Sequence, residues 1–310
     1  MFRSSVLGSL ALSFLWLPAT TLAGEESSDN ATAPPAADAA PKQDAATYRL
    51  QYKFSSGEAF RLKVTHLVTV ETKIQGVTET AQTRSVSTKV WRIAGVDPQG
   101  NITFSYAVEA ASMWQQLSGR QEIRYDSSKD ERPPAEYKHV AASIGKPLAT
   151  VTISPAGRVV DRKDAQSQFN PGIGELTIPL PEESVAIGAN WATEGELLVR
   201  LADLQVKHIK TRQMYTLEKV ETGVATIAVQ TQILTPVNDP RVQSQLVQRI
   251  KRGTVRFDLD AGRVRSQQMD IDETVIGFNG PDSIMKYLSR LSEETIPPSN
   301  VASGERKAMK

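Results

Sequence analysis

The chain has 310 residues, of which 40% are apolar and 23% are charged, and its formal net charge is +1. This composition is typical of a globular protein, and the balanced charge excludes a general electrostatic attraction to nucleic acid or to acidic membranes. The absence of cysteine excludes disulfide scaffolds, thiolate metal sites, thiol nucleophiles and lipid anchors attached through cysteine.

The N-terminal segment 1–23 has the pattern of a secretory signal peptide. Arg3 is its only charged residue, an apolar stretch runs from Val6 to Leu17, and small residues precede Ala23. The apolar stretch is shorter than the roughly 20 residues of a membrane-spanning helix. We therefore predict export to the periplasm or the extracellular space, with cleavage after Ala23; an uncleaved N-terminal anchor is the alternative.

The next segment, 24–46, contains no Val, Ile, Leu, Met, Phe, Tyr or Trp. A segment with nothing to bury cannot offset the entropy lost on ordering, so we predict a flexible linker. The polar stretch 297–310 is expected to be a flexible tail. A single β-rich domain is predicted between them, over 47–296.

Alternation with a period of two residues is the main signal in this domain. From Phe60 to Ile74 the even positions are mostly apolar, apart from His66 and Thr72, and the odd positions are mostly polar. This pattern predicts a long antiparallel strand with one buried face. Similar patterns predict further strands at 78–93, 102–109, 191–201, 206–217, 225–233, 254–259 and 263–276, and a hairpin of two strands over 148–160.

Helix signals are few. A Pro-Pro pair precedes 135–144, and Asp239 and Pro240 provide an N-cap and a first helical residue for 240–250. In the third segment, 282–294, apolar residues share one helical face. The sequence therefore predicts about three short helices.

Two parts of the chain resemble each other. Ala-Gly-Arg-Val occurs at 156–159 and again at 261–264, each time in the turn of a predicted hairpin. We predict two related antiparallel β-meander halves, about 47–163 and 185–277; shared turn chemistry without duplication is the alternative. The expected fold is mainly β: a curved sheet or half-barrel with the helices against its concave side, or a sandwich.

Catalytic signals are weak throughout. His66 lies in the apolar phase of its strand and is interpreted as a partly buried, hydrogen-bonded side chain, with a general base or a metal ligand as the alternative. His139 and His208 are expected at the surface. Two sets of carboxylates share a strand face: Asp258 with Asp260, and Asp270 with Asp272 beside Glu273. We interpret them as solvent-exposed surface side chains, with a calcium site or an acid/base site as the alternative.

The segment 112–128 is the least ordinary stretch. It places Met113, Trp114 and Leu117 before the sequence that contains Arg120, Arg124 and Tyr125. An indole next to guanidinium groups is suited to stacking on a sugar or holding an anionic head group. The alternative is that the apolar residues plug one end of the sheet while the arginines face water.

Three motifs resemble those of an uncharacterised bacterial secreted family of the planctomycete type, known as a domain of unknown function. They are Gly-Glu-Ala-Phe-Arg at 57–61, Leu-Pro-Glu-Glu-Ser-Val-x-x-Gly-x-x-Trp at 180–191, and the stretch at 252–264 that ends in Ala-Gly-Arg-Val. The resemblance covers roughly 47–295 and rests on glycines, turns and a tryptophan. It implies secretion and a β-rich fold, and implies no activity.

The sequence thus identifies no catalytic residue, no ligand-binding residue, no metal site and no cofactor. We expect a secreted, non-enzymatic binding module that holds a hydrophobic or amphipathic ligand, or a partner segment, on a concave face. A structural or interaction protein of the cell envelope is the alternative, and a hydrolase using His66 or a carboxylate pair comes third. The expected partner is a hydrophobic small molecule or an envelope protein, with no nucleic acid and no transmembrane segment after the leader.

Overall fold

The structure is a computed structural model that describes residues 46–164, 177–201 and 205–297. The predicted leader 1–23, nearly all of the linker 24–46 and nearly all of the tail 297–310 lie outside these residues. The strands are β1 (Thr47–Tyr48), β2 (Ala59–Ile74), β3 (Val77–Val96), β4 (Ile102–Leu117), β5 (Ile123–Asp126), β6 (Pro147–Ile153), β7 (Val159–Asp164), β8 (Val185–Ala186), β9 (Asn190–Arg200), β10 (Val206–Glu221), β11 (Val224–Ile233), β12 (Arg252–Asp258), β13 (Arg263–Ile276) and β14 (Ile284–Ile296). The helices are η2 (Ala135–Tyr137), a single 3₁₀ turn, with α2 (Lys138–Ser143) and α3 (Pro240–Leu246).

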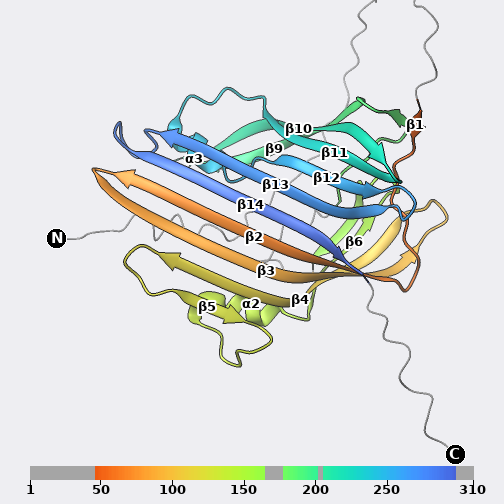
Figure 1. The fold of residues 1–310 in the computed structure, drawn as a ribbon, viewed down its shortest axis with the longest axis horizontal. Helices are drawn as coiled ribbons and strands as arrows, with labels where there is room; N and C mark the ends of the chain where they lie inside the picture. Colours follow the sequence, from red (N-terminus) through yellow and green to blue (C-terminus); the bar gives the residue numbers. More distant parts are fainter. Residues whose placement is uncertain (1–45, 165–176, 202–204, 298–310) are drawn as a thin grey trace, which may run out of the picture.

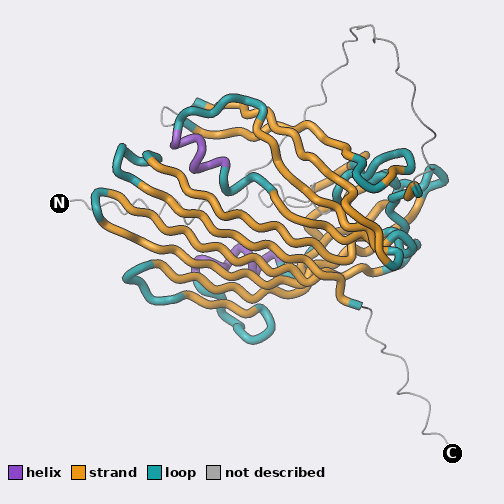
Figure 2. The backbone as a smooth tube through the Cα atoms, turned by 45° about the horizontal axis from the view of Figure 1, so that its top comes forward, coloured by secondary structure: helices purple, strands orange, loops and turns teal. Residues whose placement is uncertain are grey.

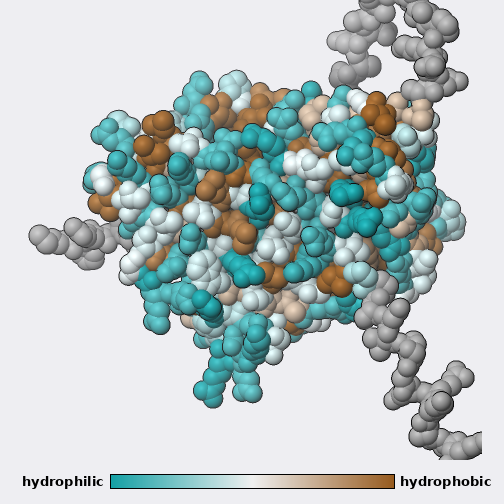
Figure 3. All heavy atoms as spheres, viewed as in Figure 1, coloured by the Kyte–Doolittle hydropathy of each residue, from teal (hydrophilic) through white to brown (hydrophobic). Residues whose placement is uncertain are grey.

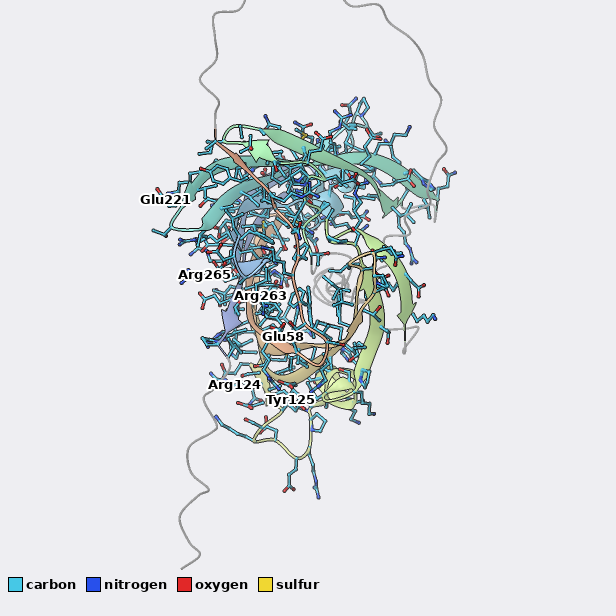
Figure 4. All side chains as sticks on the ribbon, turned by 90° about the vertical axis from the view of Figure 1, so that its right-hand side faces the viewer. Glu58, Arg124, Tyr125, Glu221, Arg263 and Arg265 are labelled. Carbon is cyan, nitrogen blue, oxygen red and sulfur yellow. The ribbon has the colours of Figure 1, made fainter. Side chains whose placement is uncertain are left out.

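One antiparallel sheet of twelve strands dominates the structure. Its order is β7-β6-β4-β3-β2-β14-β13-β12-β11-β10-β9, with β5 paired to β4 outside this path, and β1 and β8 form a separate small pair. The long strands lie side by side (Figures 1 and 2), and the end view shows that the sheet curls around an interior (Figure 4). In the described part of the chain the edge strands β7 and β9 do not pair, so the sheet is open. The prediction of a mainly β fold with a curved antiparallel sheet is confirmed, and the sandwich alternative is wrong.

The buried face of the sheet is its inner face. The largest apolar cluster joins Phe60, Trp91 and Tyr106 from β2, β3 and β4 to Tyr215 and Phe257 from β10 and β12. These two groups of strands are far apart in the sheet order, so their side chains can meet only because the sheet curves. We call this the turn-end cluster.

The N-terminal segment before β2 closes this end of the sheet by running between the two matching turns. The backbone amides of Tyr52 and Lys53 donate to the carbonyls of Pro155 and Gly262, both at 2.8 Å. A Cβ at Gly157 would lie 2.5 Å from the Tyr52 ring, and one at Gly262 would lie 2.6 Å from the Lys53 Cβ. Both glycines also have positive φ, at 76° and 61°, so the two turns require glycine for backbone conformation and for close approach.

The two predicted halves share an order of elements. Each has a three-stranded meander, then a helical segment, then a hairpin that carries Ala-Gly-Arg-Val: β2, β3 and β4 before α2, β6 and β7, and β9, β10 and β11 before α3, β12 and β13. The halves follow one another in the sheet with β14 inserted between β2 and β13. This shared order extends the four-residue match, and duplication of an ancestral unit remains our prediction.

The opposite end of the inner face is covered by α3 and the residues after it. Val242 and Leu246 of α3 pack on Val199 and Ile209, and these four residues form one buried cluster. Asp239 caps the helix by accepting from the amide of Arg241 at 2.9 Å, as its sequence predicts. A neighbouring cluster includes Val68, Val70, Val247, Ile271, Val275, Phe278, Met285 and Tyr287. We call these two clusters together the helix-end clusters.

The predicted helix over 282–294 is wrong, because this segment is strand β14, paired with both β13 and β2. Its inward residues include Met285 and Tyr287, which are buried, but also Ser289 and Glu293. Two polar residues in the inward phase hide the alternation of a strand, whereas Leu288, on the outer face, completes a false helical stripe. Both of these polar residues form hydrogen bonds with other polar side chains of the inner face.

Candidate functional site

A group of polar side chains interrupts the inner face between the turn-end cluster and the helix-end clusters. The Lys89 ammonium lies 3.3 Å from the Glu293 carboxylate, and these side chains are only 13% and 7% exposed. Gln267 donates from Nε2 to the other carboxylate oxygen of Glu293 at 2.6 Å. The carboxylate is therefore paired and hydrogen-bonded, as a buried charge must be to avoid a large desolvation cost. We call Lys89, Glu293 and Gln267, with His66, Ser289 and Tyr106, the polar centre.

His66 lies on the inner face, as predicted, and its Nε2 is 2.9 Å from the Ser289 hydroxyl. Burial, together with the nearby Lys89 ammonium, lowers the pKa of His66 to about 4. The imidazole is thus neutral at physiological pH. A histidine with so low a pKa is a weak proton acceptor near pH 7, so the contact with Ser289 gives little support to the hydrolase hypothesis. The structure favours the interpretation of His66 as a hydrogen-bonded interior side chain.

Three buried polar groups on the inner face donate to no acceptor in the described structure: Trp91 Nε1, the Tyr106 hydroxyl, whose oxygen faces the Lys89 ammonium, and Gln213 Nε2. Trp91 and Tyr106 are opposite one another in β3 and β4, and they are 2% and 0% exposed. Burial raises the pKa of Tyr106, and the Lys89 ammonium opposes this shift. Buried polar atoms without partners are rare in folded proteins, and each calls for water, an ion or a ligand.

The other predicted candidates are not brought into the polar centre. His139 is exposed, and His208 is exposed and pairs with Glu196 at 2.7 Å. Asp258 accepts backbone hydrogen bonds within the turn that follows β12, and Asp270 pairs with Arg290 on the outer face. Among the described residues there is no group of three or more His, Asp or Glu side chains arranged to hold a metal ion.

The segment 112–128 does form a pocket, beside β5, with a cavity volume of about 580 Å³. In register, Trp114 of β4 lies between Arg84 of β3 and Arg124 of β5. The Trp114 indole donates to Glu122 at 2.9 Å, and the same carboxylate pairs with Arg124 at 2.8 Å. The remaining lining residues are Ser112, Met113, Tyr125, Asp126, Lys129 and Asp130. The structure thus brings together the predicted Met113, Trp114, Arg124 and Tyr125, but it does not place Leu117 or Arg120 in the pocket.

The outer face offers no comparable feature in the view of Figure 3, which shows apolar and polar side chains mixed over the long strands. Exposed apolar residues such as Leu67 and Leu288 are scattered among charged ones, as on ordinary protein surfaces. None of the helices in the described ranges is long and apolar enough to cross a bilayer.

Comparisons with known proteins provide little further information. No family model and no curated protein matches the chain. A solved structure described as lipid–protein interactions in lipovitellin is similar over 83% of this chain and 27% of that chain, with 13% sequence identity and a TM-score of 0.47. The chain therefore spans about a quarter of the lipovitellin chain that it matches. A likeness at this level carries no information about whether the two proteins share a function.

Sequence reasoning identified His66 but missed Lys89, Glu293, Gln267 and Tyr106. Lys89 and Glu293 are 204 residues apart in the chain and meet only because β14 pairs with β2. The one local signal is a polar residue in the apolar phase of a strand, and that signal is visible at His66 because the alternation around it is regular.

Proposed function

We propose that this chain is an exported, non-enzymatic binding module whose inner sheet face holds a hydrophobic or amphipathic ligand. The observation that carries the proposal is the composition of that face. Two apolar regions flank a polar centre, and three buried groups on the face have a proton to donate and no acceptor among the described residues. Protein cores that pack only on themselves satisfy their polar groups, whereas ligand sites combine apolar walls with a few polar groups that await a partner.

The partly exposed apolar side chains of the inner face support the same proposal. Leu291 in β14 and Val108 in β4 pack against the turn-end cluster and are only partly buried. Their strands point these side chains inward, where an apolar ligand would remove the remaining surface from water at about 25 cal/mol per Å².

Two leucines of β14, Leu291 and Leu288, provide a matched test because they lie on opposite faces of the strand. We expect N-phenyl-1-naphthylamine, an uncharged fluorescent probe, to bind the delipidated domain and to be displaced by lipid extracted from the protein as purified. Leu291→Trp, which adds volume to the inner face, should weaken probe binding severalfold. Leu288→Trp, on the outer face of the same strand, should leave it unchanged, and circular dichroism should show both variants folded.

The structural-protein alternative predicts a different result. If the extract contains no lipid, and the probe binds neither the wild type nor the variants, then the inner face is a closed core and the proposal is wrong.

Export is a separate part of the proposal: we expect the N-terminus of the secreted protein to begin after Ala23, as N-terminal sequencing would show.

A further inference from the structure

We propose that the ligand of the inner face presents an uncharged oxygen acceptor, an ester or ketone carbonyl, to Tyr106 and the neighbouring Trp91. This inference rests on the proposed function and specifies the chemical class of the ligand. It follows from the hydrogen-bonding character of the unpartnered atoms and from the net charge of the polar centre.

The unpartnered atoms are donors. An indole N–H and an amide NH₂ can only donate, and these are the groups left without partners at Trp91 and Gln213. The Tyr106 hydroxyl has a proton to donate as well. Lys89 beside it carries no acceptor, so the ammonium can only donate to the phenol oxygen and cannot receive its proton. The complementary ligand group must therefore supply acceptor oxygens.

The nearby protein acceptor is directed at other groups. The two oxygens of Glu293 take one contact from Lys89 and one from Gln267, and the Tyr106 hydroxyl donates to neither of them in the described structure. A ligand carbonyl would fill the position of the absent acceptor.

The balance of charge selects an uncharged ligand. Lys89 and Glu293 cancel each other, and His66 is neutral because its pKa lies far below physiological pH. A ligand carboxylate would bring an additional, unpaired charge into a region where burial already disfavours charged groups. A ligand ammonium would meet donors rather than acceptors. An ester or a ketone meets neither objection.

A series of ligands with closely similar chains tests the acceptor and its charge. Methyl oleate, oleate and 1-octadecene all have an unsaturated chain of eighteen carbons but differ at the head: an uncharged acceptor, an anion and no acceptor. We expect the delipidated wild-type domain to bind methyl oleate most tightly, measured by displacement of N-phenyl-1-naphthylamine and by native mass spectrometry. Tighter binding of oleate than of methyl oleate, or equal binding of methyl oleate and 1-octadecene, would overturn the inference.

The variant Tyr106→Phe tests the residue, because it removes the hydroxyl and keeps the ring. We expect it to weaken methyl oleate binding about threefold to tenfold, the effect of one lost hydrogen bond, while 1-octadecene binding stays the same. Tyr137→Phe is the control, since Tyr137 is also buried but stacks on Tyr125 of β5 and is not part of the polar centre. If Tyr106→Phe weakens both ligands equally, or neither, the assignment to Tyr106 is wrong.

A second readout separates ligand binding from a structural role. Without ligand, the proton of the wild-type hydroxyl is buried and has no acceptor, although the phenol oxygen faces the Lys89 ammonium, so Tyr106→Phe should not lower the midpoint of thermal unfolding. A structural hydrogen bond at Tyr106 would instead make the variant unfold at a lower temperature. If none of the three ligands binds the wild type, the proposed function fails together with this inference; if all bind but do not discriminate, only this inference fails.

Discussion

Strand β14 carries an ion pair on each of its two faces, and the two pairs differ in environment rather than in chemistry. On the inner face, Glu293 pairs with Lys89 at 3.3 Å with side chains 7% and 13% exposed. On the outer face, Arg290 pairs with Asp270 at 2.6 Å with side chains 60% and 44% exposed. The shorter contact is the one in water, where charge interactions are screened and each partner can be solvated alone.

This comparison separates the distance between two charges from their energetic importance. On the outer face, losing one partner leaves the other hydrated. On the inner face, losing one partner leaves a charge with little water and no compensation. The same logic extends to the apolar residues of β14, which are buried on one face and exposed on the other.

The largest effect is expected at the inner pair. Glu293→Gln keeps the shape of the side chain and an acceptor oxygen, but it leaves the Lys89 ammonium without its opposite charge. We expect a loss of about 3–5 kcal/mol in the free energy of unfolding, measured by chemical denaturation. The double variant Lys89→Met with Glu293→Leu should recover much of that loss, because it removes both charges together. A single-variant loss below about 1 kcal/mol would show that the inner pair is as well solvated as the outer one.

The next effect concerns the apolar residues of the same strand. Met285 is fully buried in the helix-end clusters, whereas Leu288 is 43% exposed. We expect Met285→Ala to lower the free energy of unfolding by about 2–5 kcal/mol and Leu288→Ala to lower it by less than about 1 kcal/mol. Similar losses for the two variants would mean that the outer face is also covered, for example by a second molecule.

The inner face of β2 shows what the sequence was able to predict. Its even positions from Phe60 to Val70 point inward as predicted, because regular alternation over a long strand fixes the register of one face. The hairpins at both Ala-Gly-Arg-Val turns were also predicted, since glycine and the residues around it define the chain reversal locally.

The polar centre could not be predicted in the same way. Its main pair joins β3 to β14, and this contact depends on which strands become neighbours, a non-local property that no local pattern encodes. The polar residues of β14 also interrupted the alternation of this strand, so that its sequence predicted a helix. The polar residues of the proposed site are therefore the same residues that weakened the secondary-structure signal. Such a conflict between local sequence pattern and function is expected at binding sites.

The pH dependence of stability tests how dry the polar centre is. The folded-state pKa of His66 is lowered to about 4, below an unfolded value of about 6.5. The unfolded chain therefore binds a proton more readily, so the contribution of His66 is present above about pH 6.5 and is lost as the pH falls toward about 4. We expect a loss of about 2 kcal/mol in the free energy of unfolding between about pH 7.5 and about pH 5.

The variant His66→Gln should remove most of this pH dependence, and the exposed His139→Gln should not. The carboxyl groups of Glu58 and Asp270, whose pKa values are lowered by hydrogen bonds from arginines that outweigh the opposing effect of burial, titrate below this window. An unchanged slope in His66→Gln would show that His66 is hydrated in the folded protein and that the polar centre is open to water.

The smallest effect is expected at the outer pair, where the geometry alone would suggest a large one. Arg290→Gln removes a 2.6 Å contact with Asp270, but both side chains remain in water, so the loss should be about 0–1 kcal/mol and should shrink further at high salt. Chemical denaturation at low and high salt measures both quantities. A loss comparable with that of Glu293→Gln would mean that burial does not distinguish the two faces of β14. The polar centre would then provide no reason to place the binding site on the inner face.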